Sequence, residues 1–309
     1  MKIAVQIFGH LRTYKQCYLS LFENLLNYYD CDVFIHTWET MDHNTKTWHT
    51  YRARETGESA EKLRREISQT YHPKAIEIEK QIVKDEGVIV ANNKEISLFG
   101  MKCMMHSMVR ANKLREEYER KNNVQYDYVL CIRPDIQLLN PINFAKLADA
   151  DDGDCFYTAG FYKQKKRLSD FKYIGASDVL FFAKPDVISN ILSDTDSIIE
   201  QIKNPDTTQY GPEYSIIYAI EQMKIKPILL NYILFESFNI VRGADTTKVI
   251  PAPQQKPSNK IHDIIRKVIR FHFKHWNLEL VILPCLPFNI FEFSINTTKR
   301  FIISLGKVD

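Results

Sequence analysis

Residues 126–135 read Tyr-Asp-Tyr-Val-Leu-Cys-Ile-Arg-Pro-Asp, and this stretch decides the fold. The continuous apolar run at 129–132 is typical of a central strand that is covered on both faces. Pro134 has no amide hydrogen for the ladder, so the strand ends there and delivers Asp135 to its carboxyl end. Ligands of open α/β sheets bind at that edge. We therefore expect an α/β sheet with Asp135 in a ligand site; the alternative is a strand-ending turn with a solvated aspartate.

The composition is that of a globular protein. The chain has 309 residues, of which 45% are hydrophobic and 26% charged, enough for one large domain or two small ones. Its six cysteines lack C-x-x-C spacing, which predicts buried free thiols in a reducing compartment, not disulfides or a zinc site. Neither G-x-x-x-x-G-K-[ST] nor G-x-G-x-x-G occurs, which argues against P-loop and Rossmann dinucleotide chemistry.

The first 40 residues predict a β-α-β unit. An apolar strand at 2–8, a helical pattern to about residue 28 and a second strand at 32–38 imply a parallel pair with a right-handed crossover. The methionines of the predicted helix 97–121 recur at helical spacing and are expected in the core. Further predicted elements are helices at 61–71, 186–203 and 211–223 and strands at 75–82, 154–159, 178–183, 226–230 and 235–242.

Two strand ends carry groups suited to a nucleotide. Gly9 lets a ligand approach the backbone, Arg12 can pair with a phosphate, and His10 lies between them. Thr37 and Trp38 end the second predicted strand, where an aromatic ring could stack on a base. We expect these residues to contact a nucleotide together, although His10 alone is more typical of a structural loop histidine.

Three motifs in this order resemble bacterial cell-surface polysaccharide glycosyltransferases of the GT-A type, of the kind that build lipopolysaccharide or capsule. They are Ile-Phe-Gly-His-Leu-Arg-Thr-Tyr at 7–14, Asp-Val-Phe-Ile-His-Thr-Trp at 32–38, and the stretch 126–135. The resemblance covers roughly residues 1–245. It implies a GT-A-like nucleotide-binding α/β fold with a mostly parallel central sheet, a nucleotide-sugar donor, and a D-x-D motif that holds Mn²⁺ or Mg²⁺.

The triplet that matches D-x-D is Arg133-Pro134-Asp135, in which a base replaces the first acid. Two interpretations are open. Asp135 holds the divalent cation on the sugar diphosphate, or Arg133 neutralises a phosphate and leaves Asp135 to hold ribose or sugar hydroxyls.

The resemblance also suggests a catalytic base. Inverting transfer needs a carboxylate that removes the proton of the acceptor hydroxyl, and Glu213, at the start of a predicted helix, matches that region of the family. An acid favoured there by the helix dipole is the alternative. Asp178 is a second base candidate, or a contact of the donor sugar.

The tail differs in charge from the rest of the chain. Residues 256–309 contain nine Lys or Arg and four Asp or Glu, whereas the other residues contain 32 and 34. The proline-rich segment 251–257 reads as a linker between a catalytic domain at 1–250 and a basic tail at 258–309. In the tail, residues 260–276 predict an amphipathic helix for a membrane surface; packing on the catalytic domain or in a homodimer is the alternative, and no nucleic-acid motif accompanies it.

The sequence as a whole predicts a glycosyltransferase that moves a sugar from a nucleotide-sugar donor to a glycan or lipid-linked acceptor. We expect it in the cytoplasm, peripheral on the inner face of the membrane. A non-catalytic nucleotide- or glycan-binding module and another nucleotide-sugar or phosphoryl-transfer enzyme are the alternatives.

Overall fold

The computed structural model describes most of the first 241 residues. The described residues are 1–42, 59–81, 87–91, 94–144, 154–160, 177–193, 199–200, 216, 220 and 222–241, together with the backbone of three strands between 279 and 304. Three predictions lie outside these residues: Glu213, the linker 251–257 and the tail helix 260–276. The chain divides into two compact units, Met1–Thr246 and Thr247–Asp309. Among the helices of the described residues, none is long and apolar enough to cross a bilayer.

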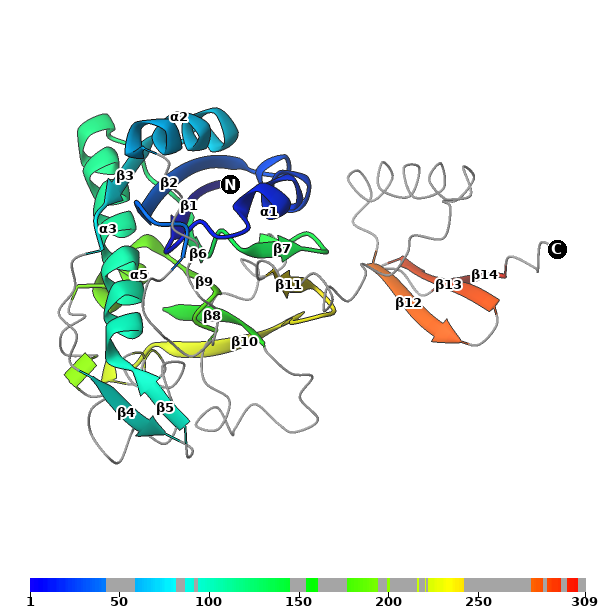
Figure 1. Cartoon of the computed structure of the whole chain (residues 1–309). Coiled ribbons are helices and arrows are strands. Elements are labelled where there is room, and N and C mark those ends of the chain that lie inside the picture. Colours follow the sequence, from blue (N-terminus) through cyan, green and yellow to red (C-terminus); the bar gives the residue numbers. More distant parts are fainter. Residues whose placement is uncertain are drawn as a thin grey trace. The chain divides into compact units, whose positions relative to one another are not determined.

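The first unit is built on a seven-stranded sheet (Figure 1). Every neighbouring pair is parallel except the two that involve β9, which runs antiparallel to β6 and to β8. The α/β class and the mostly parallel central sheet are therefore confirmed. In sheet order the strands are β10 (Lys226–Ile233), β8 (Cys155–Gly160), β9 (Leu180–Ala183), β6 (Tyr128–Ile132), β1 (Lys2–Phe8), β2 (Asp30–Trp38) and β3 (Ala75–Glu79).

The order of the strands reverses at β1. From β1 the chain builds outward through β2 to β3, and it then returns to place β6 on the other side of β1. The loops that leave the carboxyl ends of β1 and β6 therefore diverge. In open α/β sheets ligands bind in the crevice at this switch point.

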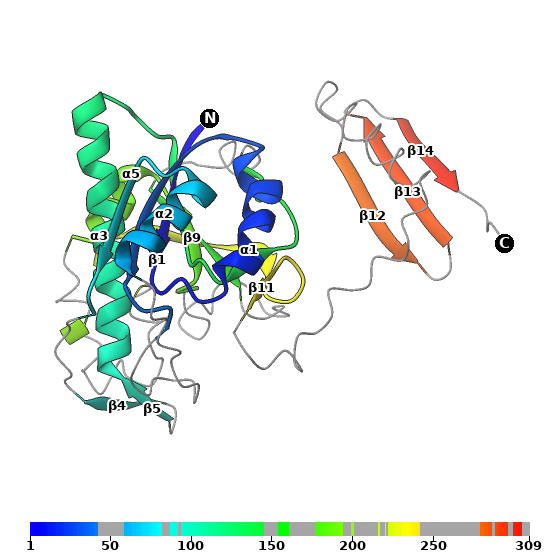
Figure 2. The ribbon, with the colours of Figure 1, turned by 45° about the horizontal axis from the view of Figure 1, so that its top comes forward.

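Helices cover both faces of the sheet. In Figure 2, α3 (Leu98–Asn122) and α5 (Pro185–Ile191) lie to one side of the strands and α1 (Tyr14–Leu21) to the other. Alternate residues of β1 serve the two faces: Ala4 and Phe8 belong to the core cluster of α3, and Ile3, Val5 and Ile7 to the cluster of α1 and of α2 (Ala60–Tyr71). A π-helical turn, Phe22–Leu26, extends α1.

The methionines of α3 fill the core, as the sequence predicted. Met101, Met105 and Met108 are buried in the cluster between α3 and the sheet. The five cysteines that the structure describes are free thiols: Cys17, Cys103, Cys131 and Cys155 are buried, as predicted, and Cys31 is half-buried.

Some predicted elements differ. The strand predicted at 235–242 does not close the main sheet: β11 (Phe238–Ile240) pairs antiparallel with β7 (Ile136–Leu138) in a separate two-stranded sheet. The physical reason is Pro134, because the chain turns there and resumes as β7 outside the main ladder. The helix predicted at 186–203 is interrupted, since α5 ends at Ile191 and helix resumes at 199. A hairpin of β4 (Val88–Ala91) and β5 (Lys94–Ser97), for which we predicted no element, precedes α3.

The second unit contains a three-stranded antiparallel sheet. Its strands are β12 (Glu279–Cys285), β13 (Phe288–Ile295) and β14 (Lys299–Ser304). The amphipathic helix that the sequence predicts at 260–276 precedes these strands and lies outside the described residues. Pro284 and Pro287 oppose a helix here.

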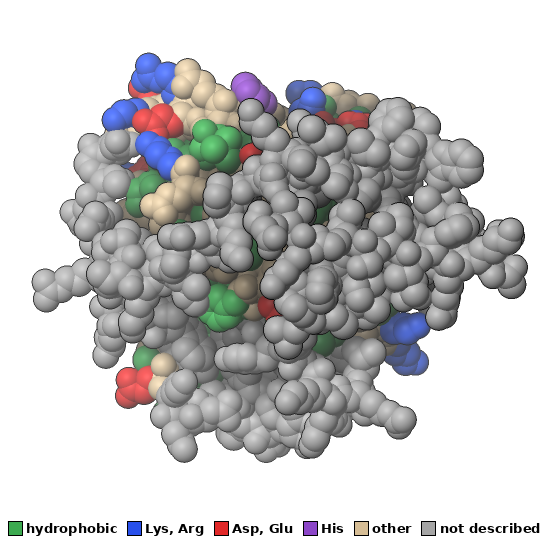
Figure 3. All heavy atoms as spheres, turned by 90° about the vertical axis from the view of Figure 1, so that its right-hand side faces the viewer, with side chains coloured by type: hydrophobic (Ala, Val, Ile, Leu, Met, Phe, Trp, Pro, Cys, Tyr) green, Lys and Arg blue, Asp and Glu red, His purple; other side chains and the backbone are tan. Residues whose placement is uncertain are grey.

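Charges of both signs are mixed on the described part of the face that Figure 3 shows. At the upper left of Figure 3, basic and acidic side chains lie next to one another around apolar ones. This mixture agrees with the near balance of charges outside residues 256–309.

Candidate functional site

The loop after β1 contains two residues with positive φ angles, Gly9 and Arg12, whose N–H groups both donate within the protein. Gly9 has a φ of 90°, in the region that favours glycine, and its N–H donates to the Ser107 hydroxyl at 2.7 Å. Arg12 also has a positive φ, 45°, and its N–H donates to the Met41 carbonyl at 2.9 Å. The Gly9 amide is thus engaged by α3, so the loop offers a ligand the Arg12 side chain and not this N–H.

Asp135 lies between two arginines at the switch point. Its side chain is fully buried, and its Oδ1 accepts a hydrogen bond from Arg133 Nε at 2.9 Å. Its Oδ2 accepts from Arg12 Nη1 at 3.1 Å and from Arg133 Nη2. Arg12 also donates from Nε to Asp42 Oδ1 at 3.0 Å. The carboxylate therefore fixes two guanidinium groups that come from the loops after β1 and β6.

These contacts bear on the Mn²⁺ or Mg²⁺ predicted at Asp135. Both of its oxygens already accept hydrogen bonds from guanidinium groups, and two positive charges adjoin them. A divalent cation at Asp135 would compete with these donors and stand beside two positive charges, so the described residues around Asp135 do not fit such an ion. The arrangement fits the other interpretation, in which an arginine neutralises a phosphate.

Arg133 is held as a cation. Burial alone would lower the pKa of Arg133, but the charges of Asp135, Asp178 and Asp42 and the hydrogen bond that Arg133 donates to Asp135 raise it. The side chains of Arg12 and Arg133 are 12% and 10% exposed. Each guanidinium carries five N–H donors, and phosphate oxygens match the geometry of that fork.

Asp178 lies at the same edge. Because β9 is antiparallel to β6, its amino end meets the carboxyl end of β6, and the Arg133 N–H donates to the Val179 carbonyl at 3.0 Å. Asp178 is half-buried, and its negative charge acts on Arg133. The fold thus brings together Arg12, Arg133, Asp135 and Asp178. The other predicted base, Glu213, lies outside the described residues.

His10 is engaged within the protein. Its Nδ1 lies 2.9 Å from the Thr40 carbonyl and its Nε2 lies 3.0 Å from Gln81 Nε2, which suits a neutral ring that donates from Nδ1 and accepts at Nε2. Burial, with the nearby charge of Arg12, lowers the pKa of His10 to about 4. A neutral ring with both nitrogens bonded gives no charge to a phosphate.

Thr37 and Trp38 are also buried. Trp38 is 1% exposed, and its ring stacks on His106 with centroids 5.4 Å apart. The Thr37 hydroxyl has no hydrogen-bond partner among the described residues. A base could stack on Trp38 only if His106 moved.

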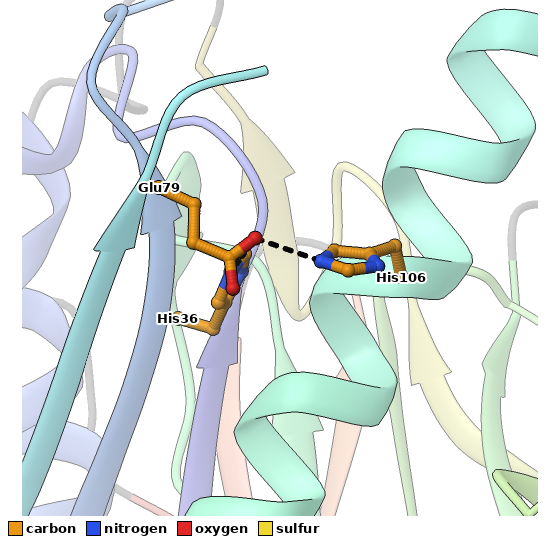
Figure 4. Close-up of side chains that lie close together, drawn as sticks. All are labelled: His36, Glu79 and His106. Carbon is orange, nitrogen blue, oxygen red and sulfur yellow. Dashed lines mark hydrogen bonds and ion pairs between the residues drawn. The ribbon is translucent and has the colours of Figure 1, made fainter. Parts of the chain in front are cut away.

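Two features of this region were not identified from the sequence. Asp42, the second partner of Arg12, follows β2 in a polar stretch without a recognisable pattern. His36, Glu79 and His106 gather their ligand atoms within 4.8 Å of one another (Figure 4). His36 belongs to one of the motifs quoted above, but its two partners are remote in sequence.

The sequence matches no protein-family model, and a search of curated proteins finds no significant match. Two arginines fixed by a buried carboxylate, with a second carboxylate beside them, can bind an anionic group and place an acid or base next to it.

Proposed function

We propose that this chain is a glycosyltransferase with a GT-A-like fold, which transfers a sugar from a nucleotide-sugar donor to a glycan or lipid-linked acceptor. One observation carries the proposal: Asp135 holds Arg12 and Arg133 together at the carboxyl edge of β1 and β6. That edge is the switch point of the sheet, where open α/β folds bind their ligands.

The arginines would bind the diphosphate of the donor. Transfer of the sugar leaves a nucleoside diphosphate on which negative charge develops as the glycosidic bond breaks. Guanidinium groups that are already oriented stabilise such charge without reorganising at the moment of reaction. Asp135 supplies this orientation, because it bonds both side chains. In this proposal the arginines take the role that a Mn²⁺ or Mg²⁺ ion would have on the diphosphate.

Asp178 would act next to the sugar. Its charge adjoins Arg133, so a diphosphate bound there would bring the anomeric carbon toward this carboxylate. In an inverting enzyme, Asp178 or Glu213 would remove the proton of the acceptor hydroxyl during attack. If Glu213 is the base, Asp178 would contact the donor sugar.

The basic tail would place the enzyme on its substrate. A lipid-linked acceptor lies at a membrane, and the excess of Lys and Arg in residues 256–309 favours an anionic surface. We therefore propose a peripheral protein on the cytoplasmic face of the membrane, used in lipopolysaccharide, O-antigen or capsule synthesis. A homodimer formed through the tail is the alternative use of this segment.

The proposal is tested by screening UDP-, GDP- and CMP-sugars for thermal stabilisation of the purified protein, with EDTA and with Mn²⁺. A ligand that binds the folded state raises its stability by mass action. We expect one nucleotide class to raise the melting temperature in EDTA as well as in Mn²⁺. If no nucleotide-sugar does so under either condition, the proposal is wrong.

A non-catalytic nucleotide- or glycan-binding module would give the same stabilisation. The two are separated by the release of the leaving nucleotide from the donor that binds, which is UDP or GDP from their sugars and CMP from a CMP-sugar. The enzyme should release it, faster with an acceptor present, and should lose this in Asp178→Asn or Glu213→Gln. A protein that binds the donor and never releases its nucleotide is a binding module.

A further inference from the structure

We infer that His36, Glu79 and His106 form a binding site for a divalent transition-metal ion of the zinc class. The ligands would be the Nε2 atoms of the two imidazoles and one carboxylate oxygen. Figure 4 shows the Glu79 carboxylate, at the end of β3, beside the His36 ring on β2 and facing the His106 ring on α3. This inference is independent of the proposed sugar transfer.

The spacing of the ligand atoms suits such an ion. Glu79 Oε2 lies 2.9 Å from His106 Nε2 and 3.7 Å from His36 Nε2. Zinc binds nitrogen and oxygen at about 2.0–2.2 Å, so a tetrahedral site places its ligand atoms roughly 3.4 Å apart. The two observed distances bracket this value. His106, whose side chain is 42% exposed, has room to adjust.

His36 gives the independent sign of a ligand. Its side chain is fully buried, and its Nε2 has no hydrogen-bond partner among the described residues. Its Nδ1 lies 2.7 Å from the Ser107 hydroxyl, which also lies 3.2 Å from the His36 carbonyl. Ser107 can therefore donate to that carbonyl and accept from Nδ1, which leaves Nε2 as a bare lone pair that faces a carboxylate. A metal-binding histidine has this form, with its second nitrogen bonded in the outer shell.

The other tautomer of His36, with its proton on Nε2, also leaves this nitrogen without a hydrogen bond. If Nε2 carried the proton, its distance of 3.7 Å to Glu79 Oε2 would be too long for a hydrogen bond, and a buried N–H would be left unsatisfied.

The competing explanation is an ion-pair cluster without metal. Arg110 Nε lies 3.2 Å from Glu79 Oε1 and also donates to Glu77 Oε2 at 2.9 Å. Arg110 thus occupies Oε1 and leaves Oε2 to the imidazoles. An ion-pair cluster accounts for the contact between His106 and Glu79. It does not account for Nε2 of His36, which lies 3.7 Å from Glu79 Oε2 and makes no hydrogen bond with the described residues.

The site would be open at one position. Three protein ligands leave a fourth place for water, as in catalytic zinc sites, and Glu79 and His106 are both partly exposed. The Trp38 ring restrains both imidazoles, stacking on His106 and meeting His36 edge-on at 5.1 Å. Ser107 links the cluster to the Gly9 N–H. A bound ion would therefore also steady the loop after β1.

The test is calorimetric titration of the metal-free, full-length protein with ZnCl₂, and spectroscopic titration with CoCl₂. We expect one ion per chain and the visible absorption of tetrahedral Co²⁺. His106→Ala and Glu79→Gln should each weaken binding by at least the roughly 10–100-fold that loss of an outer-shell partner costs. The matched control is His72→Asn: His72 is an exposed histidine on another element, and its φ of 47° suits asparagine. This control should bind like the wild type.

Two results would overturn the inference. One is a wild-type protein that binds neither ion at millimolar concentration. The other is stoichiometric binding that His106→Ala and Glu79→Gln leave unchanged, which would place the ion elsewhere. Circular dichroism of both variants checks that they are folded. Nucleotide-sugar binding is measured separately, so failure here leaves the proposed function standing, and the reverse also holds.

Discussion

Replacing Asp135 by asparagine removes the negative charge that holds Arg12 and Arg133 together. The side chain keeps its shape, but one carboxylate oxygen becomes an NH₂ group that cannot accept from a guanidinium. Asp135 is fully buried, and its two oxygens accept from both arginines. Asp135→Asn therefore leaves Arg133, which is 10% exposed, without its principal counter-charge.

The expected loss of stability is large for a conservative substitution. Removing one partner of a buried ion pair costs about 3–5 kcal/mol, and we expect the lower end because asparagine retains one acceptor. For a folding unit of this size, about 3 kcal/mol lowers the melting temperature by roughly 6–12 °C.

The assay is urea unfolding of Asp135→Asn and of a matched control, Asp42→Asn, followed by circular dichroism. Asp42 also pairs with Arg12, but its side chain is 32% exposed, so its loss should cost at most about 1 kcal/mol. Equal losses of unfolding free energy in the two variants, or a loss below about 1 kcal/mol in Asp135→Asn, would refute the claim that Asp135 is the buried counter-charge of both arginines.

Three further predictions concern pH, chemistry and the tail. Because burial and Arg12 lower the pKa of His10 to about 4, the unfolded chain protonates this residue below its ordinary value of 6.5 while the folded protein does not. The resulting loss of stability is absent above pH 6.5, reaches roughly 2 kcal/mol at pH 5 and levels off below about 4. His10→Gln should flatten that slope in urea midpoints between pH 7 and 5, and an unchanged slope would contradict this. Glu213→Gln or Asp178→Asn, whichever removes the base, should slow donor turnover by about 10²–10⁴-fold with little change in donor affinity; a loss of affinity instead would mark a sugar contact. A chain that ends at Pro257 should lose salt-sensitive sedimentation with acidic-lipid vesicles, and full-length protein that ignores such vesicles would refute the membrane role.

The sequence predicted the parallel strands well because their signals are local. The apolar run at 129–132 and the proline after it were enough to place Asp135 at a sheet edge. The direction of β9 has no such signal, since a short apolar strand reads the same in either orientation. The antiparallel β9 is what brings Asp178 to Arg133, so this proximity could not be derived from the pattern.

The remaining parts of the two sites depend on distant residues. Asp42 reaches Arg12 only because the loops after β1 and β2 leave the same edge of the sheet. His36, Glu79 and His106 come from two strands and a helix, without the close spacing that makes a metal motif readable. The buried state of Trp38 was missed because a strand-end tryptophan gives no sign of the helix that will cover it.

Donor binding by Arg12 tests the central claim most directly. The measurement is the calorimetric dissociation constant of the nucleotide-sugar that stabilises the protein, in EDTA, for the wild type and for Arg12→Met. Arg12 is replaced and not Arg133, because in Arg12→Met the buried Asp135 carboxylate keeps the two hydrogen bonds that Arg133 donates to it. Loss of one charge-assisted contact of about 1.5–3 kcal/mol should weaken binding by roughly 10–150-fold while the variant stays folded. Equal affinity in the two proteins would show that the diphosphate does not bind at the edge of β1 and β6.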